Sequence, residues 1–360
     1  MGEQVRIGYS CWGFLGPGIT DTPDGGRSHR RTLIDGLICA GHDVVFLQAN
    51  RDLAEAGQDL TGSYTWDSGL PGIDALFLEW RWPIPGRNTT GCGADRHTCD
   101  LHRQDQLVTG YIRGQGMPTV IWDKDLQLPR GHPLRGLPNV AVCEPGLLPG
   151  PGATSLLFPV ADAVLDTADP AALAARARPL PLVYVGNQYD RDGMFGAYFA
   201  PAAAQFGHRV AGKWTDTGGW PHVNFTGRCP FSEVRRLYRS ALATVLLLPD
   251  RYARAGQMTQ RLFEAVLAGC LPITPAGIAC AGRFTPPVLH AADGQQVIDR
   301  LRHAQAAAGT AWHAATLADC LERLGTFRLS RQIATLNRVL ERLTDASSYA
   351  RLPGTPARPR

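Results

Sequence analysis

The stretch of this sequence with the most chemical content is residues 256–273, where a glycine-containing loop runs into a predicted helix over 258–268. The first N–H groups of a helix have no intrahelical acceptor and carry partial positive charge, so they suit a pyrophosphate. Glu264, a turn or more inside the helix, can accept hydrogen bonds from a ribose diol. The pattern predicts one helix that binds both phosphate and ribose. An ordinary amphipathic helix with a solvated glutamate is the alternative.

Length and composition limit what can surround this helix. The chain has 360 residues, whereas single cores stop growing at roughly 250–300, so we expect two domains. Hydrophobic residues make up 44% and charged residues 19%, which excludes an intrinsically disordered chain. A net charge of +4 does not demand a nucleic-acid partner and does not repel phosphates.

Targeting signals and cysteine usage indicate the compartment. The N-terminus lacks the basic and apolar segments of a signal peptide, and no apolar run approaches 18 residues. The nine cysteines are scattered and odd in number, which favours reduced thiols over a disulfide framework. We therefore expect a cytoplasmic protein.

Strands and helices alternate in the first half of the chain. The predicted strands span 5–10, 44–47, 73–78, 118–122 and 140–143, and the predicted helices span 28–39 and 98–111. This order indicates an α/β fold with a doubly wound parallel sheet, whose ligands bind beyond the carboxyl ends of the strands.

The alternation of strands and helices resumes after an Ala- and Pro-rich segment. The second half is predicted to hold strands at 182–186, 209–211, 244–248 and 271–274 and helices at 232–240 and 258–268. We expect an N-terminal Rossmann-like domain over 1–165, a linker over 166–180 and a second Rossmann-like domain over 181–329. A helix over 330–349 is placed to pack back on the first domain, and 350–360 forms a disordered tail.

Two glycine-rich motifs do not fit nucleotide cofactors. The loop at 13–18 reads G-x-x-G-x-G, whereas the dinucleotide fingerprint is G-x-G-x-x-G. The stretch at 207–213 satisfies G-x-x-x-x-G-K, but Trp214 stands where a magnesium-binding Ser or Thr belongs. No dinucleotide or triphosphate chemistry is expected, although Lys213 can still contact a phosphate.

The segment at 261–272 resembles the donor-site helix of GT-B glycosyltransferases of the group-1 and spore-maturation types, in which R-x-F-E-A-x-x-x-G-x-x-P recurs. The matching residues are Arg261, Phe263, Glu264, Ala265, Gly269 and Pro272. Residues 183–191 are similar to the first strand and loop of that family's donor domain, and 40–44 to a turn of its acceptor domain. The resemblance implies a GT-B architecture, two Rossmann-like domains facing a central cleft.

For donor binding, the resemblance implies that Glu264 holds the nucleotide ribose and that Arg191 and Lys213 hold the diphosphate. The remaining residues expected at the donor site are Gly186, Asn187, Thr259, Gln260 and Arg261. Retaining members often carry a second glutamate eight residues before the first, where this chain has Gly256. The stereochemical outcome therefore stays open.

The acceptor hydroxyl must lose a proton, for which a carboxylate or an oriented histidine is suitable. Asp21, Asp24 and His29 follow the first strand, and Asp123 ends a later one; these four are the catalytic candidates. The alternative is a purely structural role for the first loop, in which Asp-Gly forms a common turn and Ser28 caps the following helix. The acceptor-binding candidates are Gly16, Arg27, Glu79 and Arg81.

A second cluster offers zinc ligands, namely Cys92, His97, Cys99 and His102. Its spacing, C-x4-H-x-C-x2-H, is not a standard zinc pattern, because His97 and Cys99 flank a single residue. A loop over the acceptor cleft is the favoured interpretation, and zinc binding stays open.

The sequence thus predicts a glycosyltransferase that moves a sugar from a nucleotide-diphosphate sugar to an acceptor hydroxyl. The acceptor classes left open are a natural product, a glycan and a modified nucleobase. No cofactor beyond the nucleotide sugar is required, and a divalent metal is not expected. The alternatives are a nucleotide-sugar epimerase of the same fold and a non-catalytic nucleotide-sugar-binding protein.

Overall fold

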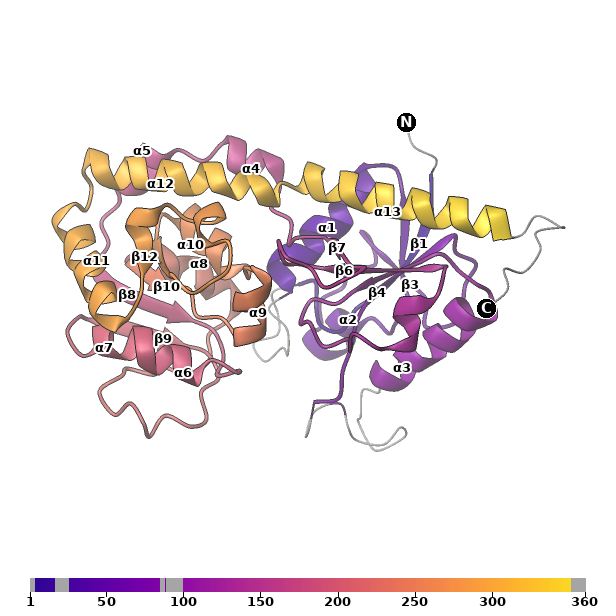
Figure 1. The fold of residues 1–360 in the computed structure, drawn as a ribbon, viewed down its shortest axis with the longest axis horizontal. Coiled ribbons are helices and arrows are strands. Elements are labelled where there is room, and N and C mark those ends of the chain that lie inside the picture. The colour runs from indigo at the N-terminus through magenta and orange to yellow at the C-terminus, as the bar shows by residue number, and fades with distance from the viewer. Residues whose placement is uncertain (1–3, 17–25, 85–87, 89–99, 351–360) are drawn as a thin grey trace.

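The computed structural model describes residues 4–16, 26–84, 88 and 100–350 (Figure 1). Its strands form a seven-stranded sheet and a five-stranded sheet, each made of parallel pairs. We call the elements β1 to β7 and their helices the N-terminal half, and β8 to α12 the C-terminal half. The α/β class and the expectation of two Rossmann-like sheets are confirmed.

The N-terminal sheet has the order β3-β2-β1-β4-β5-β6-β7. Its strands are β1 (Arg6–Ser10), β2 (Asp43–Phe46), β3 (Thr65–Trp66), β4 (Ala75–Glu79), β5 (Thr119–Trp122), β6 (Val140–Glu144) and β7 (Thr154–Ser155). The helices are α1 (Arg27–Cys39), α2 (Arg51–Ala56), α3 (Asp100–Leu107) and α4 (Asp162–Asp166). The helix expected to end at 111 instead continues past α3 as a π-helical segment, Val108–Gly114.

The C-terminal sheet has the order β12-β11-β10-β8-β9. Its strands are β8 (Leu180–Val185), β9 (His208–Ala211), β10 (Ala241–Val245), β11 (Leu271–Pro275) and β12 (His290–Ala291). The helices are α5 (Pro170–Ala174), α6 (Asp192–Met194), α7 (Ala200–Ala203), α8 (Phe231–Ser240), α9 (Asp250–Ala255), α10 (Arg261–Ala268), α11 (Gly294–Ala306) and α12 (Ala311–Leu324). The strand expected at 244–248 therefore lies about three residues earlier.

The chain crosses between the two halves at two adjacent places. The backbone of Val160, leaving the N-terminal half, pairs with Phe327 and Leu329, which return to it, through N–H···O bonds of 2.8 Å each. The last helix, α13 (Leu329–Ala350), then runs along the N-terminal half and contacts α1, β5 and β6 (Figure 1). A Cβ on Gly36 of α1 would lie 2.8 Å from the Leu329 methyl carbons, so this glycine permits the close crossing of the two helices.

Buried apolar side chains from the strands and from α13 form the core around the N-terminal sheet. The strands next to the site are buried on both faces, as parallel sheets require: β4 and β5 are buried throughout. Helix α13 turns Leu336, Val339, Leu340 and Leu343 inward, each no more than 8% exposed. Among the described helices, none combines the length and apolar character needed to cross a bilayer.

Candidate active site

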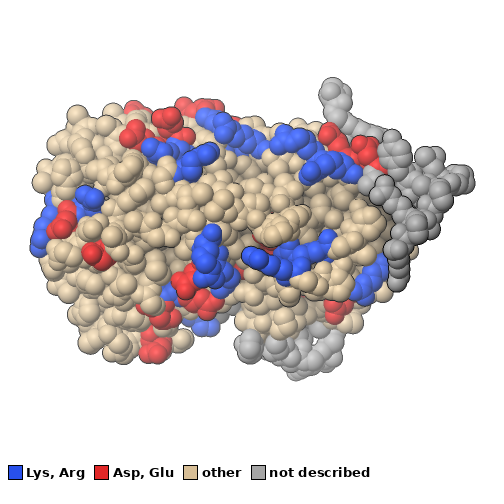
Figure 2. Space-filling view, viewed as in Figure 1, with Lys and Arg blue, Asp and Glu red and all other residues tan. Residues whose placement is uncertain are grey.

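A cleft of about 410 Å³ separates the two halves and is lined by residues of both. The C-terminal half contributes the loop after β8, the loop after β9 and the start of α10. The N-terminal half contributes the start of α1, residues after β4 and β5, and the start of α3. Figure 2 shows Lys and Arg side chains near the middle of this face, on both sides of the boundary between the halves.

The loop after β8 is held against β9 by side-chain to backbone bonds. Asn187 Oδ1 accepts from the N–H of Lys213 at 2.8 Å, and Gln188 Oε1 accepts from the N–H groups of Thr215 and Asp216 at 2.9 Å each. The two loops approach so closely that a Cβ on Gly212 would lie 2.1 Å from the carbonyl oxygen of Gly186. Both glycines therefore permit a fixed double loop at the carboxyl ends of β8 and β9.

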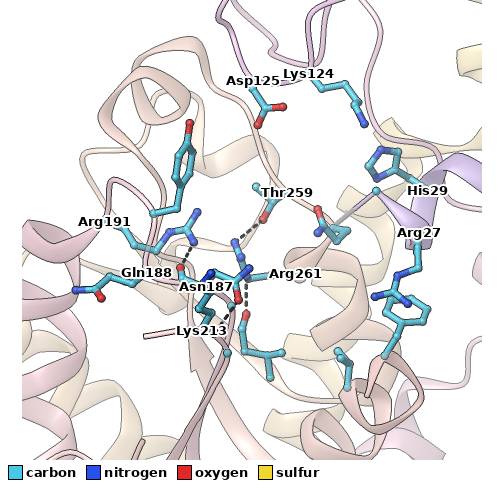
Figure 3. Close-up of a pocket in the computed structure, with 18 of the residues that line it drawn as sticks. Arg27, His29, Lys124, Asp125, Asn187, Gln188, Arg191, Lys213, Thr259 and Arg261 are labelled. Atoms are coloured by element: carbon cyan, nitrogen blue, oxygen red, sulfur yellow. Dashed lines mark hydrogen bonds between the residues drawn. The ribbon is translucent and has the colours of Figure 1, made fainter. Parts of the chain in front are cut away.

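Three cations converge on this double loop (Figure 3). Arg261 Nε donates to the carbonyl of Val185 at 2.6 Å, and a Cβ on Gly186 would lie 2.4 Å from its guanidinium. Arg191 is 5% exposed, and its Nη1 donates to the carbonyl of Asn187 at 2.5 Å. Lys213 is exposed and lines the same wall. The wall is therefore strongly positive.

Arg191 is the most informative of these cations. Burial lowers the pKa of its guanidinium, and its Nε is buried without a hydrogen-bond partner among the described residues. No carboxylate of the described chain forms an ion pair with it. A buried charge without a counter-ion is unfavourable, so this arrangement suits a bound anion.

Helix α10 starts at Arg261, three residues later than expected. Its residues Arg261 and Glu264 line the cleft, as do Thr259 and Gln260 just before it. Gly256 ends α9 with φ of 58°, in the left-handed region, and a Cβ there would also lie 3.1 Å from the carbonyl of Ala279. The backbone therefore favours glycine at position 256, where the resemblance led us to look for a second glutamate.

Glu264 reaches across the cleft in this structure. Its Oε1 accepts a hydrogen bond from the hydroxyl of Ser28, at the start of α1 in the other half. Burial raises the pKa of Glu264, opposed by Ser28 and Arg261. The alternative in which Ser28 caps the helix does not hold, because α1 begins at Arg27 after Gly26 and its N-cap makes no side-chain bond.

Arg27 and His29 continue the N-terminal wall. The Arg27 guanidinium lies 4.9 Å from the ring centre of Phe231, in the C-terminal half, and donates to the carbonyl of Gly16 at 3.3 Å. His29 is 2% exposed and stacks on Phe158 with ring centres 4.2 Å apart. Both residues line the cleft, whereas Gly16 lies behind it.

Glu79 does not line the cleft, although its neighbours do. Its carboxylate is 1% exposed and accepts from Arg30 Nε and Nη2, both at 2.8 Å, and from the Tyr9 hydroxyl at 2.7 Å. Lys124 Nζ lies 2.5 Å and Arg81 Nη2 3.3 Å from Glu79 Oε2. Burial alone would raise the pKa of Glu79, but these three cations hold it well below its usual range. The residue is a buried counter-ion that positions Arg81 and Lys124.

The structure also places Asp123 away from the cleft. It is fully buried, and its two oxygens accept from the N–H groups of Gln127 and Leu128 at 2.9 and 2.8 Å. Burial raises the pKa of Asp123 to about 6. Both bonds shape the loop after β5, so Asp123 supports that loop. Its neighbour Asp125 lines the cleft and accepts from the hydroxyl of Tyr252 in the C-terminal half.

Asp100, which the sequence analysis did not single out, also lines the cleft from the first residue of α3. Both of its carboxylate oxygens are shielded from solvent, and neither accepts a hydrogen bond of normal geometry from the described residues. Burial raises the pKa of Asp100, opposed chiefly by Arg81. Buried carboxylates of this kind are frequent at functional sites.

Several candidates lie outside the described residues, namely Asp21, Asp24, Cys92, His97 and Cys99. His102 is described, and its Nε2 lies 3.0 Å from the side-chain nitrogen of Gln106. Within the described ranges, no three His, Cys, Asp or Glu side chains are grouped as metal ligands.

Residues 196–323 match the model of a family described as glycosyl transferase-like. No curated protein matches the sequence significantly. T4 phage β-glucosyltransferase, solved with UDP and Mn²⁺, matches with a TM-score of 0.64 and 11% identity over 94% of this chain and 99% of that one. An α-glucosyltransferase in complex with UDP-glucose and DNA containing an abasic site gives a TM-score of 0.62, 11% identity and 94% and 100% coverage.

A third match, AviGT4, is a glycosyltransferase involved in avilamycin A biosynthesis, with a TM-score of 0.58, 13% identity and coverage of 96% of this chain and 98% of that one. At such identities the likeness establishes the fold, and it extends over both halves of the molecule. The family match lies in the half that carries α10 and most of the cationic wall. The chain therefore has the GT-B fold of these glycosyltransferases, and its residues 196–323 are similar to a family described as glycosyl transferase-like.

Proposed function

We propose that this protein transfers a sugar from a uridine diphosphate sugar to an acceptor hydroxyl in the cleft between its halves. The observation that carries the proposal is the buried guanidinium of Arg191 beside the start of α10, which forms no ion pair with any carboxylate of the described residues. Two of the structural neighbours were solved with UDP or UDP-glucose, which supports uridine as the nucleoside.

The donor is assigned to the C-terminal wall. Arg191, Lys213 and Arg261 would neutralise the diphosphate, and the first N–H groups of α10 would donate to its oxygens. Glu264 would accept from the ribose hydroxyls in place of Ser28. The nucleotide would also contact the loop after β8, at Gly186 and Asn187, and the residues just before α10, Thr259 and Gln260.

The acceptor is assigned to the opposite wall, lined by Arg27, His29 and Arg81. We propose Asp100 as the general base, because its carboxylate oxygens are shielded from solvent, make no hydrogen bond of normal geometry with the described residues, and lie on the acceptor side of the cleft. It would take the hydroxyl proton as the acceptor oxygen bonds to C1 of the sugar and the bond from C1 to the diphosphate breaks. His29, packed on Phe158, is the second candidate for this proton.

Charge neutralisation by arginine and lysine leads us to propose that transfer does not depend on a divalent metal. One neighbour was solved with Mn²⁺, so the rate with and without a chelator is the direct test. The seven cysteines within the described ranges are free thiols, which is typical of a reducing compartment. We place the enzyme in the cytoplasm on that basis.

Thermal unfolding with a panel of nucleoside diphosphates tests the proposal. A ligand at 100 times its Kd stabilises the folded state by about 2.7 kcal/mol, so UDP should raise the melting temperature by several degrees. Arg191→Ala should abolish most of the shift, whereas Arg254→Ala, at an exposed position on α9, should retain it. If no nucleoside diphosphate shifts the transition of the wild-type protein, the proposed function is wrong.

A further inference from the structure

Arg251, on α9, bonds to both halves of the molecule. Its Nη1 donates to the carboxylate of Asp190 at 2.6 Å and its Nη2 to the hydroxyl of Tyr189 at 3.1 Å, both in the loop after β8. Its Nε donates to the backbone carbonyl of Asp125 at 2.9 Å, in the loop after β5 of the N-terminal half. Figure 1 shows α9 at the boundary between the halves. A single guanidinium therefore joins a loop of one wall of the cleft to a loop of the other.

The ion pair between Arg251 and Asp190 is too exposed to contribute much by itself. The side chain of Arg251 is 21% exposed and that of Asp190 is 56% exposed. Ion pairs at such exposure are screened by solvent and are worth little. The Arg251 guanidinium also lies over two aromatic rings, 5.3 Å from the ring centre of Tyr189 and 4.9 Å from that of Tyr252. The importance of Arg251 therefore depends on the backbone that its contacts hold in place.

Both loops that Arg251 contacts contain a residue in an unfavourable backbone conformation. Asp190 has φ of 47°, and Leu126, next to Asp125, has φ of 53°. Within the described ranges, three non-glycine residues have positive φ, and these are two of them. The left-handed region is unfavourable for an L-residue unless surrounding contacts compensate for it. Arg251 bonds the left-handed residue itself in one loop and its neighbour in the other, so it is placed to hold both.

The conformation of Asp190 sets the direction of Arg191, the residue proposed above to bind the diphosphate. Arg191 follows Asp190 directly, and its Nη1 returns to the carbonyl of Asn187 at 2.5 Å. The chain must therefore reverse between 187 and 191, and the left-handed φ of Asp190 is part of that turn. A right-handed or extended Asp190 would turn the Arg191 side chain in another direction.

The loop after β5 is the counterpart on the opposite wall. Its residues Lys124 and Asp125 line the cleft, whereas Arg251 does not. Figure 3 shows Lys124 and Asp125 together at one edge of the cleft, with Arg191 at another. The hydroxyl of Tyr252, the residue after Arg251, donates to the carboxylate of Asp125 and so adds a second bond between α9 and this loop.

We propose that Arg251 is a positioning residue: it holds the loop that presents Arg191 to the diphosphate and couples that loop to the one that carries Lys124 and Asp125. This inference rests on the proposed function, because that function assigns the diphosphate to Arg191. Since one guanidinium serves both loops, a diphosphate that steadies the first also steadies the second. Arg251 itself touches neither substrate.

Calorimetry with UDP and with uridine tests the effect on Arg191. Arg251→Ala should weaken UDP about tenfold and leave uridine affinity unchanged, because Arg191 acts on phosphate alone. Arg251→Lys should restore part of the UDP affinity, since a lysine can pair with Asp190 but lacks the planar fork that reaches three acceptors. Arg254→Ala, at an exposed position on the same helix, should bind UDP as the wild-type protein does.

Two substitutions of Asp190 separate backbone conformation from charge. Both Asp190→Ala and Asp190→Gly remove the partner of Arg251, but glycine enters the left-handed region without penalty and alanine does not. Asp190→Ala should therefore weaken UDP about as much as Arg251→Ala, whereas Asp190→Gly should bind UDP nearly as the wild-type protein does. Because Asp190 is exposed, this comparison decides the inference even if Arg251→Ala fails to fold.

Hydrogen exchange of residues 123–128 tests the coupling between the loops. Saturating UDP should slow exchange there in the wild-type protein and in Arg254→Ala, and should not do so in Arg251→Ala. A residue with a merely structural role would change exchange equally with and without UDP.

Three results would overturn the inference while leaving the proposed function standing. They are an unchanged UDP affinity in Arg251→Ala, equal UDP affinities in Asp190→Ala and Asp190→Gly, and an exchange rate at 123–128 that UDP does not alter in the wild-type protein. Failure of UDP to bind the wild-type protein would instead overturn the proposed function.

Discussion

Replacing Glu264 tests whether α10 binds a ribose. In the free enzyme its carboxylate already accepts one hydrogen bond, from Ser28. A ribose diol that displaces Ser28 offers two hydroxyl donors, so binding adds a net of one bond to a charged acceptor. Such a bond is worth about 1.5–3 kcal/mol. Glu264→Ala should therefore weaken UDP about 10- to 150-fold, since each 1.4 kcal/mol is tenfold in Kd.

Comparing two nucleotides in the wild-type protein and in Glu264 variants makes the assay specific for the ribose contact. Calorimetry at pH 8, where a carboxyl group of raised pKa is more fully ionised, compares UDP with 2′-deoxy-UDP. The wild-type protein should favour UDP by about tenfold, and the preference should vanish in Glu264→Ala and be reduced in Glu264→Gln. Glu322→Ala, at an exposed position on α12, is the matched control. The helix should not suffer, because alanine is the better helix former.

A preference for UDP over its deoxy form that survives Glu264→Ala would refute the assignment. Glu264 would then serve as a contact between the two halves, through its hydrogen bond with Ser28. The double variant Ser28→Ala, Glu264→Ala separates the two roles. If the carboxylate serves only to hold the halves together, the double variant should bind UDP as the single variants do and unfold at a lower temperature than the wild-type protein.

Three further outcomes follow from the contacts described above. Asp100→Asn should lower the rate of a single turnover about 10²–10⁴-fold with UDP affinity unchanged. It should also remove the acid limb of the pH–rate profile, which burial shifts toward higher pH by raising the pKa of Asp100. Arg191→Ala and Lys213→Ala should weaken UDP far more than uridine in calorimetry, because their charge faces phosphate; equal losses would contradict this role. Glu79→Gln should destabilise the protein by about 3–5 kcal/mol in urea unfolding, because three buried cations lose their carboxylate. Since its folded pKa is lowered, the contribution of Glu79 is present above the unfolded pKa of about 4.3 and is lost as pH falls through the folded value.

Local patterns were sufficient to predict most of the fold and the residues that form the C-terminal wall of the cleft. Buried parallel strands are short apolar runs, and the motif around Glu264 is contiguous, so both are visible in a single stretch of chain. The acceptor wall depends on distant pairs instead. Glu79 ends a strand as a ligand-binding residue would, yet its partners Arg30 and Lys124 come from other segments and bury it.

The same reasoning explains why the sequence analysis did not single out Asp100 and considered Ser28 only as a helix cap. Asp100 begins a polar helix and has no distinctive neighbours in sequence; its burial comes from tertiary packing around Arg81. Ser28 has the type and position of a helix cap, but its partner Glu264 lies 236 residues away. Periodicity and capping rules operate over a few residues and contain no information about such pairs.

Helix α13 has a consequence for how the chain folds during synthesis. The N-terminal half leaves the ribosome before α13, and the apolar side chains of Leu336, Val339 and Leu340 that cover α1, β5 and β6 are made only after the whole C-terminal half. Contacts of such large sequence separation form slowly, and an uncovered apolar face is prone to aggregation. The N-terminal half should therefore remain incompletely packed until α13 has been made, and should need α13 supplied with it when it is produced alone.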